Sequence, residues 1–397
     1  MLLIRIGKSI SAIRDNGWRQ GLALIFGGLK RFFLPVKAGD VLIVAAGAGD
    51  STRYRAHHYA EELNLNGIKT SIVMQDRPFL LPLVKRFKVF IFQRTLVTAK
   101  IKQLVKEIKK QNKEIIFETD DLVYDPKFIQ HMDYYQKMNS LEKKLYQNGV
   151  GGEILRDNYV KVCTTSTNFL KRKLEEEGKK VFLVKNKLSK EDVKWGKEIL
   201  NNKFQISNSY DDKVRLGYFS GTFSHNKDFD TIRRPLMRIL ENNSNVRLCL
   251  AGPLDINDEL SQKFGQQIER IPFVERKKHF EHIARVDINL VPLEIDNPFC
   301  QAKSELKFFS AGLVKVPTVA SATDTFIEAI EDGVDGFVAK NETEWETKLQ
   351  QLIDSPELRQ RLGEKAYETT IKKYTTENAN NEEYYEYLRK KISNLEF

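Results

Sequence analysis

Short apolar runs alternate with amphipathic stretches along most of the chain, and this alternation restricts the possible folds more than any other feature. The run Val41–Ala46 is apolar throughout, which is typical of a strand covered on both faces of a parallel sheet. Helical spacing appears between such runs, for example at Ile101, Leu104, Val105 and Ile108. Comparable strand-like runs occur at 71–74, 89–92, 115–117, 160–163, 181–184, 214–219, 246–251, 287–291 and 316–320. Repeated strand–helix alternation predicts parallel sheets with helices on both faces.

One segment breaks the alternation and suggests two units. Residues 195–212 are rich in Asn, Ser, Lys and Asp, and we interpret them as a linker. The sequence therefore predicts an α/β protein with two tandem doubly wound domains, at 38–205 and 212–375. Ligands of such sheets bind beyond the carboxyl ends of the strands, so we expect the active site in the cleft between the domains.

Composition excludes several other classes of protein. The three cysteines, Cys163, Cys249 and Cys300, form no CxxC pair, which argues against a disulfide scaffold or a zinc site and favours a reducing compartment. No stretch of about 18 apolar residues is present that would form a membrane-spanning helix. We expect a cytoplasmic protein.

The positive charge is concentrated at the start of the chain. The formal net charge is +10, and residues 1–37 hold seven basic residues against one acidic residue. The same leader carries Trp18, Phe26, Phe32 and Phe33, a mixture that suits an amphipathic anchor at the inner face of the cell membrane. A helix packed on the first domain fits the leader equally well. The positive charge lies mostly in the leader, and no interleaved platform of aromatic residues for stacking bases stands out. We therefore expect no nucleic-acid partner.

Two segments of the second half carry the candidate donor chemistry. In the first, a small-residue loop containing Gly221 and Thr222 follows the strand 214–219, and a helix starts near Asp228. Free N–H groups at a helix start suit a phosphate, and Lys227 adds a positive charge. An ordinary strand-to-helix turn with a surface lysine is the alternative.

The second segment, residues 297–312, leads into the strand-like sequence 316–321. Lys303 lies just before a predicted helix start, Ser304 is a suitable N-cap, and Glu305 falls in the first turn. A buried amphipathic helix entering a strand is the alternative interpretation.

Together these segments resemble the large GT-B family of retaining glycosyltransferases related to bacterial polysaccharide synthesis (family 4-like, group 1). Gly221 and Lys227 match the family's first donor motif, with Thr222 at the usual arginine position. Both glutamates of the family's E-x(7)-E motif are absent, since Ala302 and Ser310 occupy their positions. Ser304 and Lys307 resemble a Ser-x-x-Lys variant of this motif, and residues 311–321 and 328–338 match the sequence that follows it.

The resemblance implies a division of labour between the two domains. The N-terminal domain would bind the acceptor, the C-terminal domain the nucleotide sugar, and a terminal helix at 376–397 would return to the N-terminal domain. No cofactor or bound metal is implied. The resemblance makes Asp120 and Glu305 candidate catalytic residues. Donor-binding candidates are Gly221, Thr222, Lys227, Lys303, Ser304, Glu305 and Lys307, and acceptor-binding candidates are Gly49, Arg53, Arg55 and Asp121.

We therefore expect a glycosyltransferase that moves a sugar from a nucleotide donor to a glycan or lipid-linked saccharide in cell-surface glycoconjugate assembly. Glu294 and Glu305 are candidates to bind the ribose or sugar hydroxyls. The alternative is a catalytically inactive subunit of the same fold that binds sugar nucleotides or serves as a scaffold, because both motif glutamates are missing. Donor hydrolysis or transfer by the purified protein separates the two.

Overall fold

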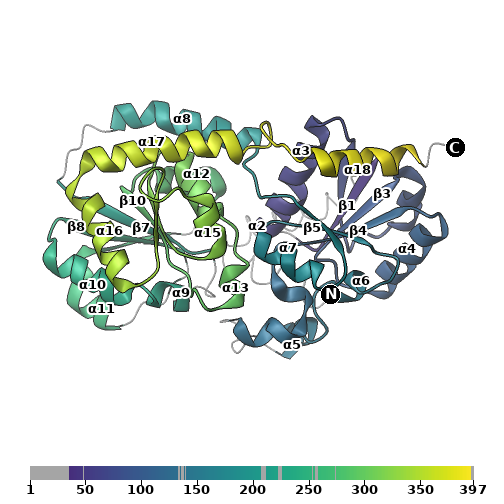
Figure 1. The fold of residues 1–397 in the computed structure, drawn as a ribbon, viewed down its shortest axis with the longest axis horizontal. Helices are drawn as coiled ribbons and strands as arrows, with labels where there is room; N and C mark the ends of the chain where they lie inside the picture. Colours follow the sequence, from purple (N-terminus) through teal and green to yellow (C-terminus); the bar gives the residue numbers. More distant parts are fainter. Residues whose placement is uncertain are drawn as a thin grey trace, which may run out of the picture.

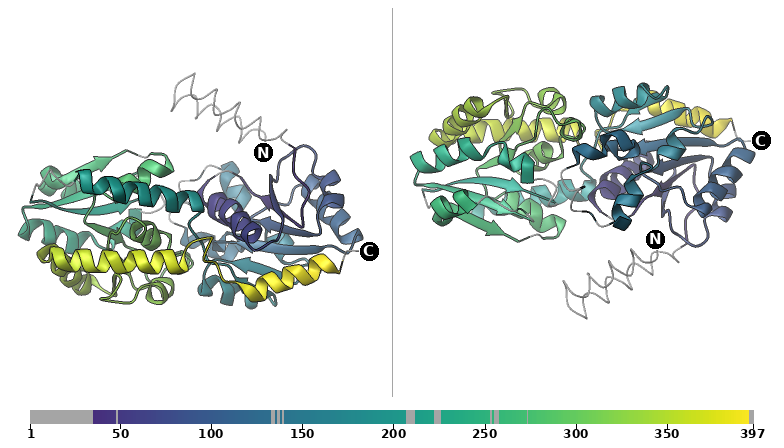
Figure 2. Two further views of the ribbon diagram at one scale, coloured as in Figure 1. Left: turned by 90° about the horizontal axis from the view of Figure 1, so that it is seen from above. Right: turned by 90° about the horizontal axis from the view of Figure 1, so that it is seen from below.

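The chain forms two parallel six-stranded sheets, each with helices on both faces (Figure 1, Figure 2). This computed structural model describes residues 35–394 except 48, 133–134, 136–137, 139, 207–211, 222–225, 253, 255–257 and 273. The two sheets lie side by side, and the chain crosses back to the first domain at its C-terminal end. The predicted α/β class and tandem doubly wound architecture are confirmed.

The first sheet has the strand order β2-β1-β3-β4-β5-β6, with all neighbours parallel. Alternate residues of β1 face opposite sides, since Leu42 and Val44 join one hydrophobic cluster while Val41 and Ile43 join another. The strands are β1 (Val41–Ala45), β2 (Thr70–Met74), β3 (Val89–Gln93), β4 (Glu114–Thr119), β5 (Val162–Thr165) and β6 (Lys180–Leu183).

The second sheet has the order β12-β11-β10-β7-β8-β9 and is also parallel throughout. Its central strands are buried on both faces, as their apolar sequences require. The strands are β7 (Val214–Phe219), β8 (Val246–Ala251), β9 (Ile268–Ile271), β10 (Ile288–Val291), β11 (Thr318–Ser321) and β12 (Phe337–Ala339).

Helices connect the strands within each domain. Those of the first domain are α2 (Asp50–Thr52), α3 (Tyr59–Leu65), α4 (Ala99–Lys110), α5 (Ser140–Tyr146), α6 (Gly152–Leu155) and α7 (Asn168–Glu175). Those that follow β6 are α8 (Lys190–Ile206), α9 (Asn226–Asp230), α10 (Arg233–Asn242), α11 (Asp258–Phe264), α12 (Arg276–Ile283), α13 (Pro298–Gln301), α14 (Leu306–Gly312), α15 (Asp324–Ala329), α16 (Glu342–Asp354), α17 (Pro356–Lys373) and α18 (Glu382–Ser393).

The interpretation of residues 195–212 as a linker is wrong for the part that the structure describes. Helix α8 runs to Ile206, and Val193 and Ile199 belong to a hydrophobic cluster of the second domain. Gly196 permits this packing, because a Cβ at that position would lie 2.6 Å from Leu313 Cγ. The polar composition of the segment reflects the exposed face of an amphipathic helix, and the chain passes between domains earlier, at residues 184–189.

A second crossing returns the chain to the first domain, as the resemblance implied. The yellow helices α17 and α18 lie in line, α17 over the second domain and α18 over the first (Figure 1). Tyr384 and Tyr385 of α18 are buried in the same cluster as β1. The two crossing segments pair with each other, because Leu188 N–H donates to Tyr374 O at 2.7 Å and Thr376 N–H donates to Leu188 O at 2.9 Å. The two segments that connect the domains are therefore hydrogen-bonded to each other through an isolated β-bridge between Leu188 and Thr375.

Most of the leader, residues 1–34, lies outside the described residues, and so do its expected membrane contacts. The chain enters the first domain at Val36, which is buried in the core. None of the described helices combines the length and the hydropathy that crossing a bilayer requires.

Candidate active site

The topology places a ligand-binding position in the second domain between β7 and β10. From β7 the chain moves outward to β8 and β9, and it then returns to β10 on the other side of β7. Ligands of doubly wound sheets bind beyond the carboxyl ends of the strands at such a reversal. The loop with Ser220 and Gly221 follows β7, and the turn leading to α13 follows β10.

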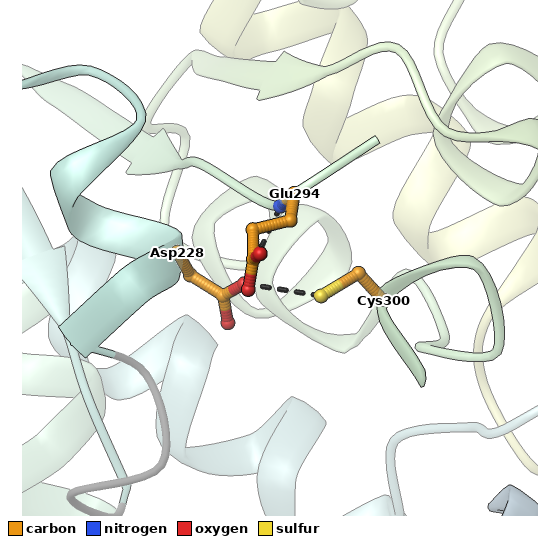
Figure 3. A group of neighbouring side chains, drawn as sticks. All are labelled: Asp228, Glu294 and Cys300. Atoms are coloured by element: carbon orange, nitrogen blue, oxygen red, sulfur yellow. Dashed lines mark hydrogen bonds between the residues drawn. The ribbon is translucent and has the colours of Figure 1, made fainter. Parts of the chain in front are cut away.

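A buried carboxylate that the sequence analysis did not select marks this position. Asp228 of α9 is 3% exposed, and its Oδ1 accepts hydrogen bonds from Cys300 Sγ at 3.1 Å and from the Glu294 backbone N–H at 3.4 Å (Figure 3). Burial, together with the Asp228 charge, raises the pKa of the Cys300 thiol, so the thiol stays protonated and donates. An acidic residue directly after Lys227, at the start of the helix that follows β7, is the signal that could have revealed it.

Asp228, Glu294 and Cys300 each offer one ligand-type atom, all within 4.8 Å of one another. Metal-binding cysteine is a thiolate, whereas this thiol is held in its protonated form. Lys307 also brings a positive charge close to Asp228. The three residues therefore fit a hydrogen-bonded cluster better than a cation site.

Two lysines supply positive charge beside this cluster. Burial lowers the pKa of Lys307 to about 8, with Asp228 opposing the shift and Lys303 adding to it. Its Nζ lies 4.6 Å from the centre of the Tyr218 ring. Lys303 is half-buried, and its side chain has no hydrogen-bond or ion-pair partner among the described residues. Together with Lys227 on the adjoining helix, these lysines place three ammonium groups against the carboxylates of Asp228 and Glu294, which leaves one positive charge and suits a phosphate-bearing ligand.

The neighbouring residues Ser304 and Glu305 contact the first domain. Ser304 Oγ accepts a hydrogen bond from Asn186 Nδ2 at 2.8 Å. Glu305 has no exposed surface, and its Oε1 lies 3.1 Å from Lys185 Nζ. Both partners belong to the crossing segment that follows β6. The expected roles of Ser304 and Glu305 in donor binding, and of Glu305 in catalysis, remain predictions, while their observed contacts hold the start of α14 against the first domain.

The remaining candidate donor residues surround the loop after β7. Gly221 is exposed, and a Cβ added there would meet no atom within 4 Å. Lys227 is exposed on α9, next to Asp228. Thr222 lies outside the described residues. The structure thus brings Lys303 and Lys307 together beside Asp228 and places Lys227 on the adjoining helix.

The first domain has its own reversal, between β1 and β3, and Asp120 lies on the adjoining strand end. Arg94 directly follows β3, and its Nη1 lies 3.2 Å from Asp120 Oδ1. Burial opposes ionisation of Asp120, but Arg94 and Arg55 outweigh it and hold the pKa of the carboxyl below its ordinary value. Arg94 has φ 45°, a left-handed conformation that is uncommon for a residue other than glycine and concentrates at functional sites. The sequence analysis missed Arg94, although its place directly after a buried strand was visible.

The structure separates the four candidate acceptor residues. Gly49, with φ 140°, precedes α2, and Arg53 is 38% exposed beside Asp50 at 3.3 Å. Asp121 caps the short turn that follows β4 by accepting from the Leu122 N–H at 2.8 Å. Gly49 and Arg53 therefore lie in the segment that follows β1, whereas Asp121 makes a local structural contact.

Arg55 does not fit its expected role in acceptor binding. It is 1% exposed and lies in the π-helical turn Arg53–His58, between α2 and α3. Its Nε donates to Glu118 Oε1 at 2.6 Å, and its Nη1 donates to Val184 O at 2.5 Å and to Asn186 Oδ1 at 3.1 Å. Burial raises the pKa of Glu118 to about 7, against the effect of Arg55. Because Asn186 also hydrogen-bonds to Ser304, Arg55 links β4 of the first domain to the start of α14 through Asn186.

A second network joins the domains at α8. Arg276 of α12 donates to both oxygens of Asp192, at 2.6 and 2.9 Å, and to Tyr54 Oη at 2.7 Å. His58 Nε2 lies 3.7 Å from Asp192 Oδ2, and its Nδ1 lies 2.7 Å from Lys187 O. Burial lowers the pKa of His58, so the ring stays neutral here. This network fixes the π-helical turn of the first domain against the second domain.

Comparison with known proteins bears on the fold and on the second domain. Residues 201–369 match the sequence model of the family described as Glycosyl transferases group 1. The match spans most of the second domain, and the chain as a whole has the GT-B fold. No curated protein matches the chain.

Solved structures with the same fold cover nearly the whole chain. Anabaena Alr3699/HepE in complex with UDP has a TM-score of 0.58 at 12% identity, and the match covers 88% of this chain and 100% of that one. A glycosyltransferase from Rickettsia africae ESF-5 has a TM-score of 0.60 at 14% identity and covers 89% and 99%. Sucrose-phosphate synthase from Thermosynechococcus elongatus has a TM-score of 0.57 at 12% identity and covers 90% and 98%. At such identities the likeness establishes the fold alone.

Proposed function

We propose that the protein transfers a sugar from a nucleotide-sugar donor, bound at the β7–β10 edge of the second domain, to a saccharide acceptor bound over the first domain. The observation that carries this proposal is the positively charged pair Lys303 and Lys307 beside the buried Asp228, in a domain that matches group 1 glycosyltransferases. One solved protein of the same fold, Anabaena Alr3699/HepE, was crystallised with UDP and with UDP-glucose, which makes a uridine diphosphate sugar the first donor to test.

The charges suit the chemistry of the donor. As the bond from the sugar to the diphosphate breaks, negative charge grows on the leaving phosphate oxygens. Preorganised ammonium groups stabilise that charge best where little water competes, and Lys307 is half-buried. We propose a metal-independent transfer with retention, in which Lys303 and Lys307 stabilise the leaving group.

The first domain suits acceptor binding. Asp120 is ionised and held by Arg94, so its carboxylate can accept hydrogen bonds from sugar hydroxyls. Its low pKa makes it a poor proton acceptor, so we assign it to orienting the acceptor rather than to general base catalysis. For the acceptor class we propose a glycan or lipid-linked saccharide in cell-surface glycoconjugate assembly. The basic and aromatic leader would then hold the enzyme at the inner face of the membrane.

An inactive donor-binding subunit is the second candidate, and one observation favours it. The positions of the two motif glutamates, Ala302 and Ser310, are 1% and 7% exposed and carry no carboxylate. Glu305 is the nearest replacement along the chain, but it is buried and paired with Lys185.

Turnover of a donor panel distinguishes the two candidates. The purified full-length chain would be incubated with UDP-, GDP-, ADP- and dTDP-linked sugars, and the released nucleoside diphosphate would be measured. An active transferase hydrolyses one donor slowly, and Lys303→Ala reduces that rate while the exposed first-domain control Lys102→Ala does not. Binding of a donor without any turnover would support the inactive subunit, and neither binding nor turnover would refute both candidates.

A further inference from the structure

A hollow of about 360 Å³ opens at the opposite edge of the first sheet from the acceptor loops. Gly39, Lys88 and Lys113 stand just before the amino ends of β1, β3 and β4, which are neighbours in the sheet. The acceptor loops follow the carboxyl ends of these strands, about 17 Å away for a strand of five residues. The hollow is therefore separate from the cleft. Its lining residues are Gly39, Lys85, Arg86, Phe87, Lys88, Gln111 and Lys113.

The hollow has four basic residues in its lining and no carboxylate. Lys113 Nζ donates to Val84 O at 2.5 Å, which fixes it in the wall. Burial and the nearby charge of Lys88 lower the pKa of Lys113, so these ammonium groups repel each other. The neighbouring Glu107 carboxylate accepts from Gln111 Nε2 at 3.1 Å and lies 3.5 Å from Lys110 Nζ. The hollow itself is therefore positively charged, since its lining holds four basic side chains and no carboxylate.

The leader joins the fold at the same edge. Arg86, in the lining, donates from Nη2 to the Val36 carbonyl at 2.5 Å, and Ser71 Oγ donates to the Lys37 carbonyl at 2.9 Å. The preceding residues combine basic, aliphatic and aromatic side chains, a composition suited to a lipid interface. A hollow suited to an anion and a segment suited to a lipid surface therefore adjoin.

We propose that this hollow binds the phosphate of an anionic phospholipid headgroup. It gives the first domain a membrane contact of its own, beside the leader and away from the catalytic cleft. Bilayer contact at this edge leaves the cleft about 17 Å from the membrane, an orientation that suits a glycan or the distal end of a lipid-linked saccharide long enough to reach the acceptor loops. The proposal is independent of the donor chemistry.

The test compares two double variants of the full-length chain. The hollow variant, Lys85→Gln with Lys88→Gln, removes two charges from the hollow. The control variant, Lys102→Gln with Lys171→Gln, removes two exposed charges from the first turns of α4 and α7, which follow the carboxyl ends of their strands. Each lysine near an anionic surface contributes about fivefold to membrane partition, so we expect the first pair to bind vesicles of phosphatidylglycerol and phosphatidylcholine about 30-fold more weakly than the wild type. The control pair should lose less than about threefold, because its side chains lie farther from the bilayer than a Debye length.

Further measurements distinguish a phospholipid headgroup from free inorganic phosphate as the ligand. Pure phosphatidylcholine vesicles should bind much more weakly than the mixed vesicles, and high salt should release the wild type. Equal vesicle affinity of the two double variants overturns the proposal. Weakened binding of inorganic phosphate by the hollow variant, with unchanged vesicle affinity, overturns the lipid assignment. Donor hydrolysis by both variants should match the wild type, so failure here is distinguishable from failure of the proposed transferase activity.

Discussion

Lys307 should lower the stability of the free protein while it strengthens donor binding, and Lys307→Met exposes both effects. The fall of its pKa from 10.5 to about 8 corresponds to about 3 kcal/mol at neutral pH. Contact with the Tyr218 ring returns about 1 kcal/mol, so we expect Lys307→Met to stabilise the free protein by about 2 kcal/mol. For a domain of this size that is a rise in Tm of about 4–8 °C.

The stability cost of the Lys307 charge depends on pH between the folded-state and unfolded-state pKa values. The folded-state pKa lies below the unfolded value, so the penalty is fully present below pH 8 and disappears as the pH rises towards 10.5. The difference in Tm between the variant and the wild type should therefore narrow across this range. Calorimetric scans at pH 7, 8.5 and 10 would follow it.

Donor affinity should change in the opposite direction. Loss of a charged hydrogen bond to a diphosphate costs about 1.5–3 kcal/mol, which raises the Kd for UDP about 10- to 100-fold. In the wild type, Kd should also rise above pH 8, where Lys307 loses its proton, and in the variant this dependence should vanish. Lys102→Met serves as the exposed control for titration calorimetry. A variant with a lower Tm, or with unchanged UDP affinity, would refute this reasoning.

Three further predictions address other parts of the molecule. Asp120→Asn should reduce transfer to a saccharide acceptor about tenfold or more, because Arg94 loses its ionised partner. Donor hydrolysis by the same variant should stay within about twofold of the wild type. Transfer and hydrolysis rates measured in parallel would test this, and an equal loss of the two rates would contradict a role of Asp120 in acceptor binding. Arg276→Met should lower the free energy of unfolding by about 3–5 kcal/mol, because it leaves a buried carboxylate unpaired, and a urea titration with a change below about 1 kcal/mol would disprove that role. Gly252→Ala should destabilise by more than about 1 kcal/mol and weaken donor binding, because φ is +85° and the new Cβ would lie 2.0 Å from Ser220 O beside the donor loop; unchanged UDP affinity would contradict this placement.

Much of the fold could be predicted because its central strands are apolar on both faces. The strands at 214–219 and 246–251 appear with the predicted bounds. Strand β9 was missed because it lies at the sheet edge, where Glu269 and Arg270 are exposed and no apolar run remains. Helix α8 was taken for a linker because its polar face dominates its composition, and only packing on Leu313 reveals its buried side.

The candidate site was harder to predict, because side-chain pairing decides it. Spacing alone could not distinguish Arg53, which is partly exposed, from Arg55, which is buried against Glu118 only two residues later. Their different environments arise from the π-helical turn, which departs from the usual helical period. Asp228 and Arg94 had visible positions in the sequence, after Lys227 and after a buried strand, but the sequence did not show that the sheet order brings their loops beside the other strand ends.

The central claim is that the donor diphosphate lies at the β7–β10 edge of the second domain, and hydrogen-exchange mass spectrometry with UDP tests it most directly. The full-length chain would be labelled with and without saturating UDP, and uridine would serve as the control that lacks phosphate. We expect slower exchange in peptides covering residues 214–231 and 288–312, with smaller changes at 184–189 through the contacts of Lys185 and Asn186 with α14. Protection confined to residues 35–183, or no protection by UDP or by any other nucleoside diphosphate, would contradict it.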